Sequence, residues 1–440
     1  MFRVDWKRGL SFILPGGLIA LAAWGFLRPT GLPSWLQPLV DWLPLLVFGF
    51  GIVAAWRLTH ARAALAVILL AVADRALSLT GTPSGGDGIL TDIATIVWST
   101  LAVLVPLNLL GLSLIGELDA SSRWTLLPVV LYVAQALGIA WLCRQESGEL
   151  IVALTAPFVD PSWTAWTALS QPALLAFAAA WVFPMLRFAI RPDPMDSATA
   201  WASVTVFLAF HGRSIGWEPT NFFAASGVIL SAGLMATSYR SAHYDRMTGV
   251  AGRILFNQMA ARLGRRYAVG LVQIDNLDVL TRRHGPAIRD QLMGVVASKM
   301  PSTAETGKLF RYSPDMFALI FPGSGATEVL GYVEPIRKRI EAVRVSLLKG
   351  NRIREESPQM EKGAKGLLPV TVSIGVAERN EHLKRFDEVL RAAHKALYLA
   401  KQAGGNQIQH LKQTSDVALH SLLARAGSRR PAAGSTGDGS

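Results

Sequence analysis

Residues 308–321 read KLFRYSPDMFALIF, two short apolar runs separated by Ser313-Pro314-Asp315-Met316. The runs are rich in aromatic and aliphatic side chains, which are common in strands. Proline followed by aspartate is typical of a tight turn. The stretch therefore predicts a β-hairpin with strands Lys308–Tyr312 and Phe317–Phe321, and the rest of a sheet should lie on either side of it in the chain.

Two more strands are predicted around this hairpin, one before it and one after it. Tyr267–Ile274 alternates as a half-buried strand does, and Val370–Ala377 is a second apolar run. The charged stretch Leu348–Gly366 is expected to be a loop. Helical periodicity is found at Asp245–Ala261, Ile288–Met300, Thr327–Val345 and Phe386–Gln402. The order α-β-α-β-β-α-β-α contains the split βαβ unit of a ferredoxin-like α+β sheet.

The chain before Tyr239 has a different composition. Of the 440 residues, 17% are charged and 51% hydrophobic, and the mean hydropathy is +0.33. Soluble domains carry about a quarter charged residues, and the deficit lies before Tyr239. A membrane-spanning helix needs ~20 mostly apolar residues. About eight such α-helical spans are predicted, near Ser11–Leu27, Trp42–Trp56, Ala63–Leu79, Ile89–Ile115, Leu126–Leu142, Pro172–Phe188, Ala198–Phe210 and Phe222–Ser238.

Three domains follow from this division. Residues 1–238 are a polytopic membrane domain, residues 239–412 a soluble α+β domain, and residues 413–440 a tail rich in Ala, Gly, Ser and Arg that we expect to be disordered. Arginine and lysine are more frequent in the predicted inner loops than in the outer ones, which predicts that the N-terminus and the soluble domain are both on the cytoplasmic side. A cleaved secretory signal at Met1–Ala23 is the alternative for the first span.

Several features within the membrane domain are less regular. Leu150–Val159 is too short to span and is expected to be re-entrant or interfacial. Asp74-Arg75 and Asp92 are charges within predicted spans, which are either functional or paired near helix ends. The single cysteine, Cys143, excludes an intrachain disulfide. The net charge of +12 is attributed to inner loops and anionic membrane lipid, since no basic run with interleaved aromatics indicates nucleic-acid binding.

Three stretches of the soluble half resemble the GGDEF family of diguanylate cyclases. Residues 245–253, DRMTGVAGR, are similar to the opening D-x-L-T-G-L-x-N-R, and residues 371–376, TVSIGV, match T-V-S-I-G-V. Residues 396–406, ALYLAKQAGGN, resemble A-L-Y-x-A-K-x-x-G-R-N. Their order and spacing cover about Asp245–His410. The resemblance implies a nucleotidyl cyclase-type fold in which two domains bind GTP and form cyclic di-GMP, with Mg²⁺ held by carboxylates.

The resemblance also assigns site positions. The family's metal stretch, D-x-D-x-F-K-x-x-N-D-x-x-G-H-x-x-G-D, aligns with residues 273–290, QIDNLDVLTRRHGPAIRD. The first metal carboxylate is then Gln273, whereas Asp275 keeps the next acidic position. The guanine-binding Asn is replaced by Thr281 and the His by Pro286, whereas the guanine-contacting Asp290 is retained.

The signature R-Y-G-G-D-E-F reads RYSPDMF here, at residues 311–317. Asp315 retains one metal-binding carboxylate and Phe317 the last residue. Ser313-Pro314 replace the two glycines, and Met316 replaces the second acid. Proline adds bulk and removes a backbone N–H where the nucleotide should approach. Lys401 matches a phosphate-contacting lysine, whereas Gly405 stands where the family has arginine. The product-inhibition motif R-x-x-D should fall at residues 304–307, which read AETG.

Three functions compete. The first is a non-catalytic GGDEF protein that needs no cofactor and signals or scaffolds through a protein partner or a homodimer, in a layout similar to that of regulators of exopolysaccharide secretion. The second is a divergent, Mg²⁺-dependent diguanylate cyclase that binds GTP at Asp290, Asp315 and Lys401, with Asp275 replacing Gln273 as metal ligand. The third is a transporter-like membrane protein with an accessory domain, which an internal repeat would favour.

Overall fold

The computed structural model describes residues 6–26, 37–80, 89–115, 125–145, 156–213, 215–300, 307–348, 352–355 and 367–411. The chain forms two compact units, residues 1–240 and 241–440. The division falls close to the predicted domain boundary at residue 238. The tail at residues 413–440 and the inhibitory-motif positions 304–306 lie outside the described residues.

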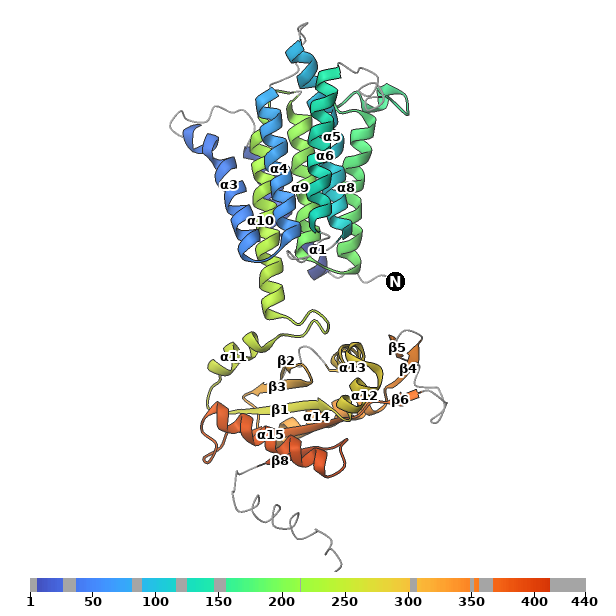
Figure 1. Cartoon of the computed structure of the whole chain (residues 1–440). Helices are drawn as coiled ribbons and strands as arrows, with labels where there is room; N and C mark the ends of the chain where they lie inside the picture. The colour runs from blue at the N-terminus through green and yellow to red at the C-terminus, as the bar shows by residue number, and fades with distance from the viewer. Residues whose placement is uncertain are drawn as a thin grey trace, which may run out of the picture. The chain divides into compact units, whose positions relative to one another are not determined.

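The first unit is a bundle of helices that run side by side (Figure 1). Its long helices are apolar along most of their length, as the sequence predicts. Their bounds are α1 Trp6–Ile13, α2 Gly16–Phe26, α3 Gln37–Arg57, α4 Ala61–Thr80, α5 Ile89–Ile115, α6 Leu126–Gln145, α8 Gln171–Ile190, α9 Pro194–Arg213 and α10 Pro219–His243, with the short 3₁₀ helix η2 at Pro161–Thr164.

Each of the eight predicted spans falls on helix, although the first is divided between α1 and α2. Five of the described helices are long and apolar enough to cross a membrane: α4, most of α5, α6, α8 and α10. Helix α9 is 20 residues long but more polar, with Asp196 in its first turn. A membrane-embedded N-terminal region is therefore supported by five helices, and the count of eight stays a prediction.

The irregular features of the membrane unit are placed in part. Asp74 is buried in α4 and pairs with Arg75, whose side chain is 45% exposed, at 2.5 Å. Asp74 and Arg75 therefore pair with each other, which was one of the two interpretations of these charges in the sequence. Residues 150–155 of the predicted re-entrant stretch and the side chain of Asp92 lie outside the described part of the chain.

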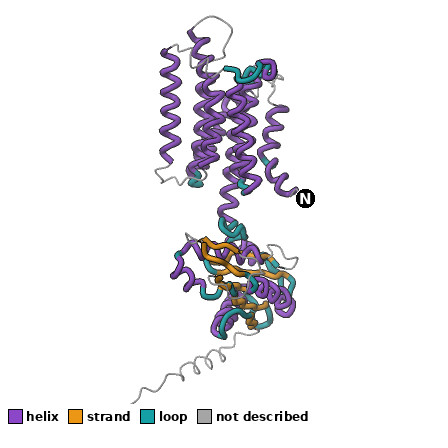
Figure 2. Tube along the Cα trace, turned by 90° about the vertical axis from the view of Figure 1, so that its right-hand side faces the viewer, coloured by secondary structure: helices purple, strands orange, loops and turns teal. Residues whose placement is uncertain are grey.

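The second unit is built on a five-stranded mixed sheet of order β2-β3-β1-β7-β8. Figure 2 draws the strands of this unit in orange. The strands are β1 Tyr267–Ile274, β2 Lys308–Ser313, β3 Met316–Pro322, β7 Val372–Glu378 and β8 Ile408–Leu411. Strand β1 pairs antiparallel with both β3 and β7, and β2 and β3 form the predicted hairpin. Each βαβ crossover thus has another strand between its two parallel strands, which confirms the ferredoxin-like topology.

Helices cover both faces of this sheet because residues of β1 alternate in direction. Ala268 and Val272 pack with α12 Leu277–His284, α13 Pro286–Lys299 and α14 Ala326–Glu341. Val269 and Leu271 pack on the opposite face, with α11 Arg253–Ala261 and α15 Phe386–Gln402. The sheet is buried on both faces, so the hairpin turn at one edge is among the few places where a strand end reaches solvent.

Several parts of the secondary structure differ from the prediction. The helix predicted from Asp245 begins at Arg253, and helix α12 was not predicted. The helix predicted to reach Val345 ends at Glu341, because Arg344–Leu348 forms strand β4. Strand β4 pairs with β5 Arg352–Glu355 and β6 Leu367–Pro369, so the stretch predicted as a loop contains a small second sheet. Strand β8 adds a parallel edge to β7 that the sequence patterns did not indicate.

Candidate functional site

The hairpin turn carries the signature residues. Strand β2 ends at Ser313 and β3 begins at Met316, so Pro314 and Asp315 form a two-residue turn. The turn is held by Arg311, whose Nη2 donates to the Pro314 carbonyl at 2.6 Å. The same guanidinium lies over the Phe317 ring, 5.3 Å from its centroid. Burial is the main cause that lowers the pKa of Arg311, and its hydrogen bond and aromatic contact fix the turn.

Asp315 is hydrogen-bonded through both carboxylate oxygens. Strand β1 pairs with β3 so that Gln273 lies opposite Met316, next to the turn. The Gln273 Nε2 donates to Asp315 Oδ2 at 2.6 Å, and Ser313 Oγ donates to Oδ1 at 2.6 Å. Two neutral groups from within the domain thus occupy the directions in which an acidic turn residue would otherwise bind a cation.

Asp275 belongs to a different network at the end of β1. Its carboxylate accepts hydrogen bonds from Thr371 Oγ1 at 2.8 Å, Ser373 Oγ at 2.7 Å and the Asn406 backbone N–H at 2.9 Å. Gly405 lies directly against it: a Cβ there would come within 3.1 Å of the carboxylate, and φ is +75°. Asp275 therefore ties β1 to β7 and to the loop after α15. The two residues that the resemblance makes metal ligands, Asp275 and Asp315, are held by separate sets of donors.

Helices α12 and α13 carry the positions to which the resemblance assigns guanine binding. Thr281 lies in α12, and its buried Oγ1 has no hydrogen-bond partner among the described residues. Pro286 is the first residue of α13, where proline is well tolerated. Asp290 is in the next turn and forms an ion pair with Arg289 at 3.8 Å. Both side chains are partly exposed, so this pair contributes little to stability.

Arg289 is a site residue that the sequence comparison missed. The family's metal stretch ends in x-x-G-D, and Arg289 replaces the glycine of this ending, directly before the retained Asp290. Its Nε is buried without a hydrogen-bond partner in the described part of the chain. A guanidinium in place of a hydrogen atom fills space beside Asp290 and partly neutralises that carboxylate. The aligned pattern itself contained this signal, because arginine for glycine changes both size and charge.

The donor set does not fit a pair of Mg²⁺ ions. Magnesium needs oxygen ligands in octahedral geometry, normally including carboxylates. Gln273 points its amide nitrogen, a donor, at Asp315, and Met316 offers a thioether. Among the described residues, no three acidic, histidine or cysteine side chains form a group that could hold a metal ion. Lys401 lies half-buried on α15.

Comparison with known proteins agrees with this architecture. Residues 242–407 match the family described as "Diguanylate cyclase, GGDEF domain". Residues 242–407 form a GGDEF domain. The diguanylate cyclase VdcA of Vibrio cholerae is 24% identical over 181 residues, 40% of this chain and 49% of that protein. Diguanylate cyclase A of Treponema denticola is 28% identical over 139 residues, 31% of this chain and 33% of that protein.

The chain thus spans about half or less of the length of these relatives. A solved structure, the GGDEF domain of DgcB from Caulobacter crescentus in complex with c-di-GMP, is 25% identical. The match covers 38% of this chain and 95% of that chain, with a TM-score of 0.33. These likenesses concern the GGDEF domain.

Proposed function

We propose that this protein is a membrane-anchored, non-catalytic GGDEF protein that works as a signalling or scaffolding module in a cyclic di-GMP-related pathway. The observation that carries the proposal is the Gln273–Asp315–Ser313 hydrogen-bonded group. Preorganised charge at the reacting phosphoryl group is usually the largest contribution to such catalysis. Here the Asp315 carboxylate, which should help to supply this charge, is hydrogen-bonded to an amide and a hydroxyl. Met316 stands where the family has the second acidic residue.

The loss of chemistry leaves the fold intact, which supports a binding role. The hairpin strands stay paired from Lys308–Ile320 to Ser313–Met316, with one irregularity between Arg311 and Ser313, and Arg311 donates to the Pro314 carbonyl. The proposed partner is a protein or a second GGDEF domain, with GTP or another nucleotide as a ligand that Asp290, Asp315 and Lys401 could contact without turnover. The resemblance in layout to regulators of exopolysaccharide secretion gives the cellular setting that we propose for this module.

The test is a turnover assay on the full-length protein in membranes, with GTP and Mg²⁺ or Mn²⁺ and detection of cyclic di-GMP by mass. We expect no product from the wild type. The quadruple variant Gln273→Asp, Ser313→Gly, Pro314→Gly and Met316→Glu restores the family signature and shows whether the scaffold can still be made active. Product formed by the wild type and abolished by Asp315→Ala would overturn the proposal in favour of a divergent cyclase.

The cytoplasmic position of the GGDEF domain is part of the proposal and rests on the arginines of the predicted inner loops. Arg246→Cys in a Cys143→Ser background places one thiol just after the membrane unit. It should resist a membrane-impermeant thiol reagent in intact cells and react once the cells are opened. Labelling in intact cells would reverse the topology and remove the domain from the compartment that holds GTP.

A further inference from the structure

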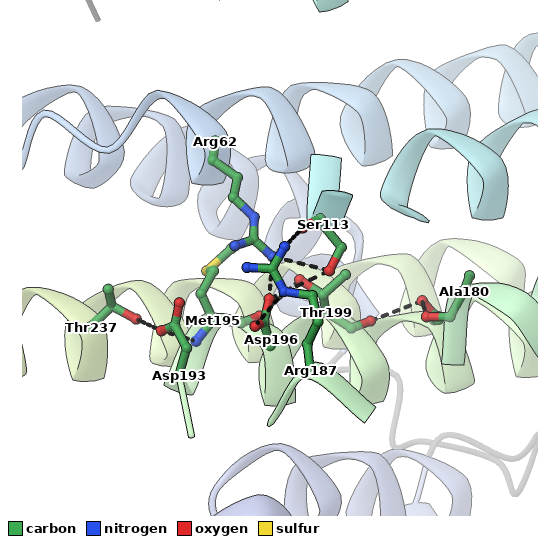
Figure 3. Close-up of polar contacts among 10 residues, drawn as sticks. Arg62, Ser113, Ala180, Arg187, Asp193, Met195, Asp196, Thr199 and Thr237 are labelled. Atoms are coloured by element: carbon green, nitrogen blue, oxygen red, sulfur yellow. Dashed lines mark hydrogen bonds and ion pairs between the residues drawn. The ribbon is translucent and has the colours of Figure 1, made fainter. Parts of the chain in front are cut away.

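A charged cluster lies inside the membrane unit, at the end of the bundle from which α10 continues to the GGDEF domain in sequence (Figure 3). Arg62, in the first turn of α4, donates to Asp196 Oδ1 of α9 at 2.7 Å. Their side chains are 2% and 1% exposed. Arg187, in the last turn of α8, contacts the other oxygen, Oδ2, at 3.2 Å. One buried carboxylate therefore holds two guanidinium groups from two other helices.

The C-terminal end of α5 is drawn into the same cluster. Ser113 Oγ lies 3.4 Å from both Asp196 Oδ1 and Arg62 Nη2, and the Ser113 carbonyl accepts from Arg187 Nη1. Arg62 Nη1 is buried and has no hydrogen-bond partner among the described residues. Loss of the Asp196 carboxylate would remove the acceptor and the negative charge that the two guanidinium groups share. Two cations would then remain in an apolar bundle, where uncompensated charge is costly.

Asp196 also lies next to a set of contacts on α10. Asp193, in the turn before α9, accepts from Thr237 Oγ1 of α10 at 3.4 Å. The carbonyl of the adjacent Pro192 accepts from Arg240 Nη1. Figure 3 shows that the Asp193–Thr237 contact and the Arg62–Asp196–Arg187 group lie on either side of Met195. The turn before α9 therefore contacts the C-terminal turns of α10.

The backbones of α9 and α10 are close at the same point. A Cβ added to Gly233 of α10 would lie 2.3 Å from the Ala198 Cβ of α9. Such close approach of small residues is a common means by which membrane helices associate. Movement of the start of α9 toward α10 would therefore have to displace α10, since there is no free space between the Ala198 methyl group and the Gly233 backbone.

We propose that the Arg62–Asp196–Arg187 cluster is a latch: it fixes the start of α9 to α4, α5 and α8, and through Asp193, Pro192 and Gly233 it fixes the end of α10. A change in the membrane unit that separates these helices must break the ion pairs, and the end of α10 is then released. The latch gives the membrane unit a physical route to the helix that leads into the GGDEF domain. It does not depend on whether that domain is catalytic.

Hydrogen–deuterium exchange of the full-length protein in nanodiscs tests the latch. Asp196→Asn should accelerate amide exchange in residues 237–243 by roughly tenfold or more, a change of ~1.4 kcal/mol in local opening free energy. Asp74→Asn is the matched control, because it removes another buried carboxylate of the bundle, one that pairs with its own helix neighbour. It should leave the exchange of residues 237–243 unchanged.

A second variant keeps the proposal testable if Asp196→Asn does not fold. Thr237→Val with Arg240→Met removes the contacts of α10 with the turn before α9 and leaves the ion cluster intact. It should accelerate exchange in residues 237–243 by a smaller factor, without changing α4 or α8. The latch is overturned if a folded Asp196→Asn variant exchanges at residues 237–243 as the wild type does, or if Asp74→Asn accelerates this exchange as much as Asp196→Asn does. If Asp196→Asn does not fold, unchanged exchange in the double variant overturns it.

Discussion

Asp196 in the membrane unit and Asp315 in the GGDEF domain are both carboxylates with two occupied oxygens, but their donors differ. Asp196 is held by two arginines, whereas Asp315 is held by an amide and a hydroxyl. In an apolar bundle a buried negative charge persists only with cations beside it. At a partly exposed turn, neutral hydrogen-bond donors and water are sufficient to stabilise a carboxylate. The comparison shows that the same residue type is ion-paired between helices in one unit and is held by neutral donors at a hairpin turn in the other.

The largest expected effect breaks the charged side of this comparison. Asp196→Asn should lower the free energy of unfolding of the membrane unit by about 3–5 kcal/mol, because it leaves Arg62 buried without a counter-ion. Denaturation in detergent, followed by tryptophan fluorescence, measures it. Asp74→Asn should cost less, since its partner Arg75 is 45% exposed and can reach solvent. Equal losses from the two variants would show that bridging between helices adds nothing.

The next effect converts the neutral site into a charged one. Gln273→Asp places a second carboxylate beside Asp315, and two such groups cannot both ionise without repulsion. Without metal, the GGDEF domain should lose about 2 kcal/mol of stability, an effect of one to two pKa units between the carboxylates. Millimolar Mg²⁺ should restore the loss in the variant and leave the wild-type melting temperature unchanged. A wild type stabilised by Mg²⁺ as strongly as the variant would contradict the neutral-donor interpretation.

A smaller effect follows from removing the amide alone. Gln273→Leu should cost about 1–2 kcal/mol, because Asp315 Oδ2 loses its donor within the domain while water can reach part of the turn. Thermal unfolding of the full-length protein, followed by amide hydrogen exchange at residues 308–322, measures this loss of stability. Gln291→Leu provides the control, since this glutamine of α13 donates to the Ala287 carbonyl of its own helix at 3.3 Å. The turn hypothesis fails if both changes have the same small effect.

The smallest expected effect concerns a neutral polar pair within the membrane unit. Asn108 of α5 and Gln135 of α6 exchange two hydrogen bonds, at 2.7 and 3.1 Å. Interhelical hydrogen bonds of this kind average ~0.6 kcal/mol, so Asn108→Leu should cost far less than Asp196→Asn in the same denaturation experiment. A loss as large as that of Asp196→Asn would mean that polarity, and not charge, dominates the stability of the bundle.

The sequence by itself determined the two-part organisation and the fold of the soluble part. Apolar runs long enough to span a membrane can be distinguished in the sequence from strands, in which apolar and polar residues alternate. The reason is that lipid and the core of a sheet require different spacings of apolar residues. The RYSPDMF hairpin, the ferredoxin-like order and the positions of Gln273, Met316 and Gly405 were all available from residue type and spacing. The short strands β4, β5 and β8 were not, since pairing with neighbours far along the chain stabilises them more than local pattern does.

Only the tertiary structure decided how the polar groups are partnered. The sequence placed Gln273 at a metal position and counted it as a loss, but only the register of β1 against β3 brings its amide to Asp315. It left Asp275 free to act as a metal ligand, whereas Thr371, Ser373 and the Asn406 backbone are folded against it. Arg62 lies 125 residues before Arg187 and 134 residues before Asp196, so no local sequence pattern links it to them. The three side chains nevertheless meet in one cluster. The physical reason is the same in each case: hydrogen bonds and ion pairs depend on distances of a few ångströms between side chains, and those distances are set by how distant segments pack.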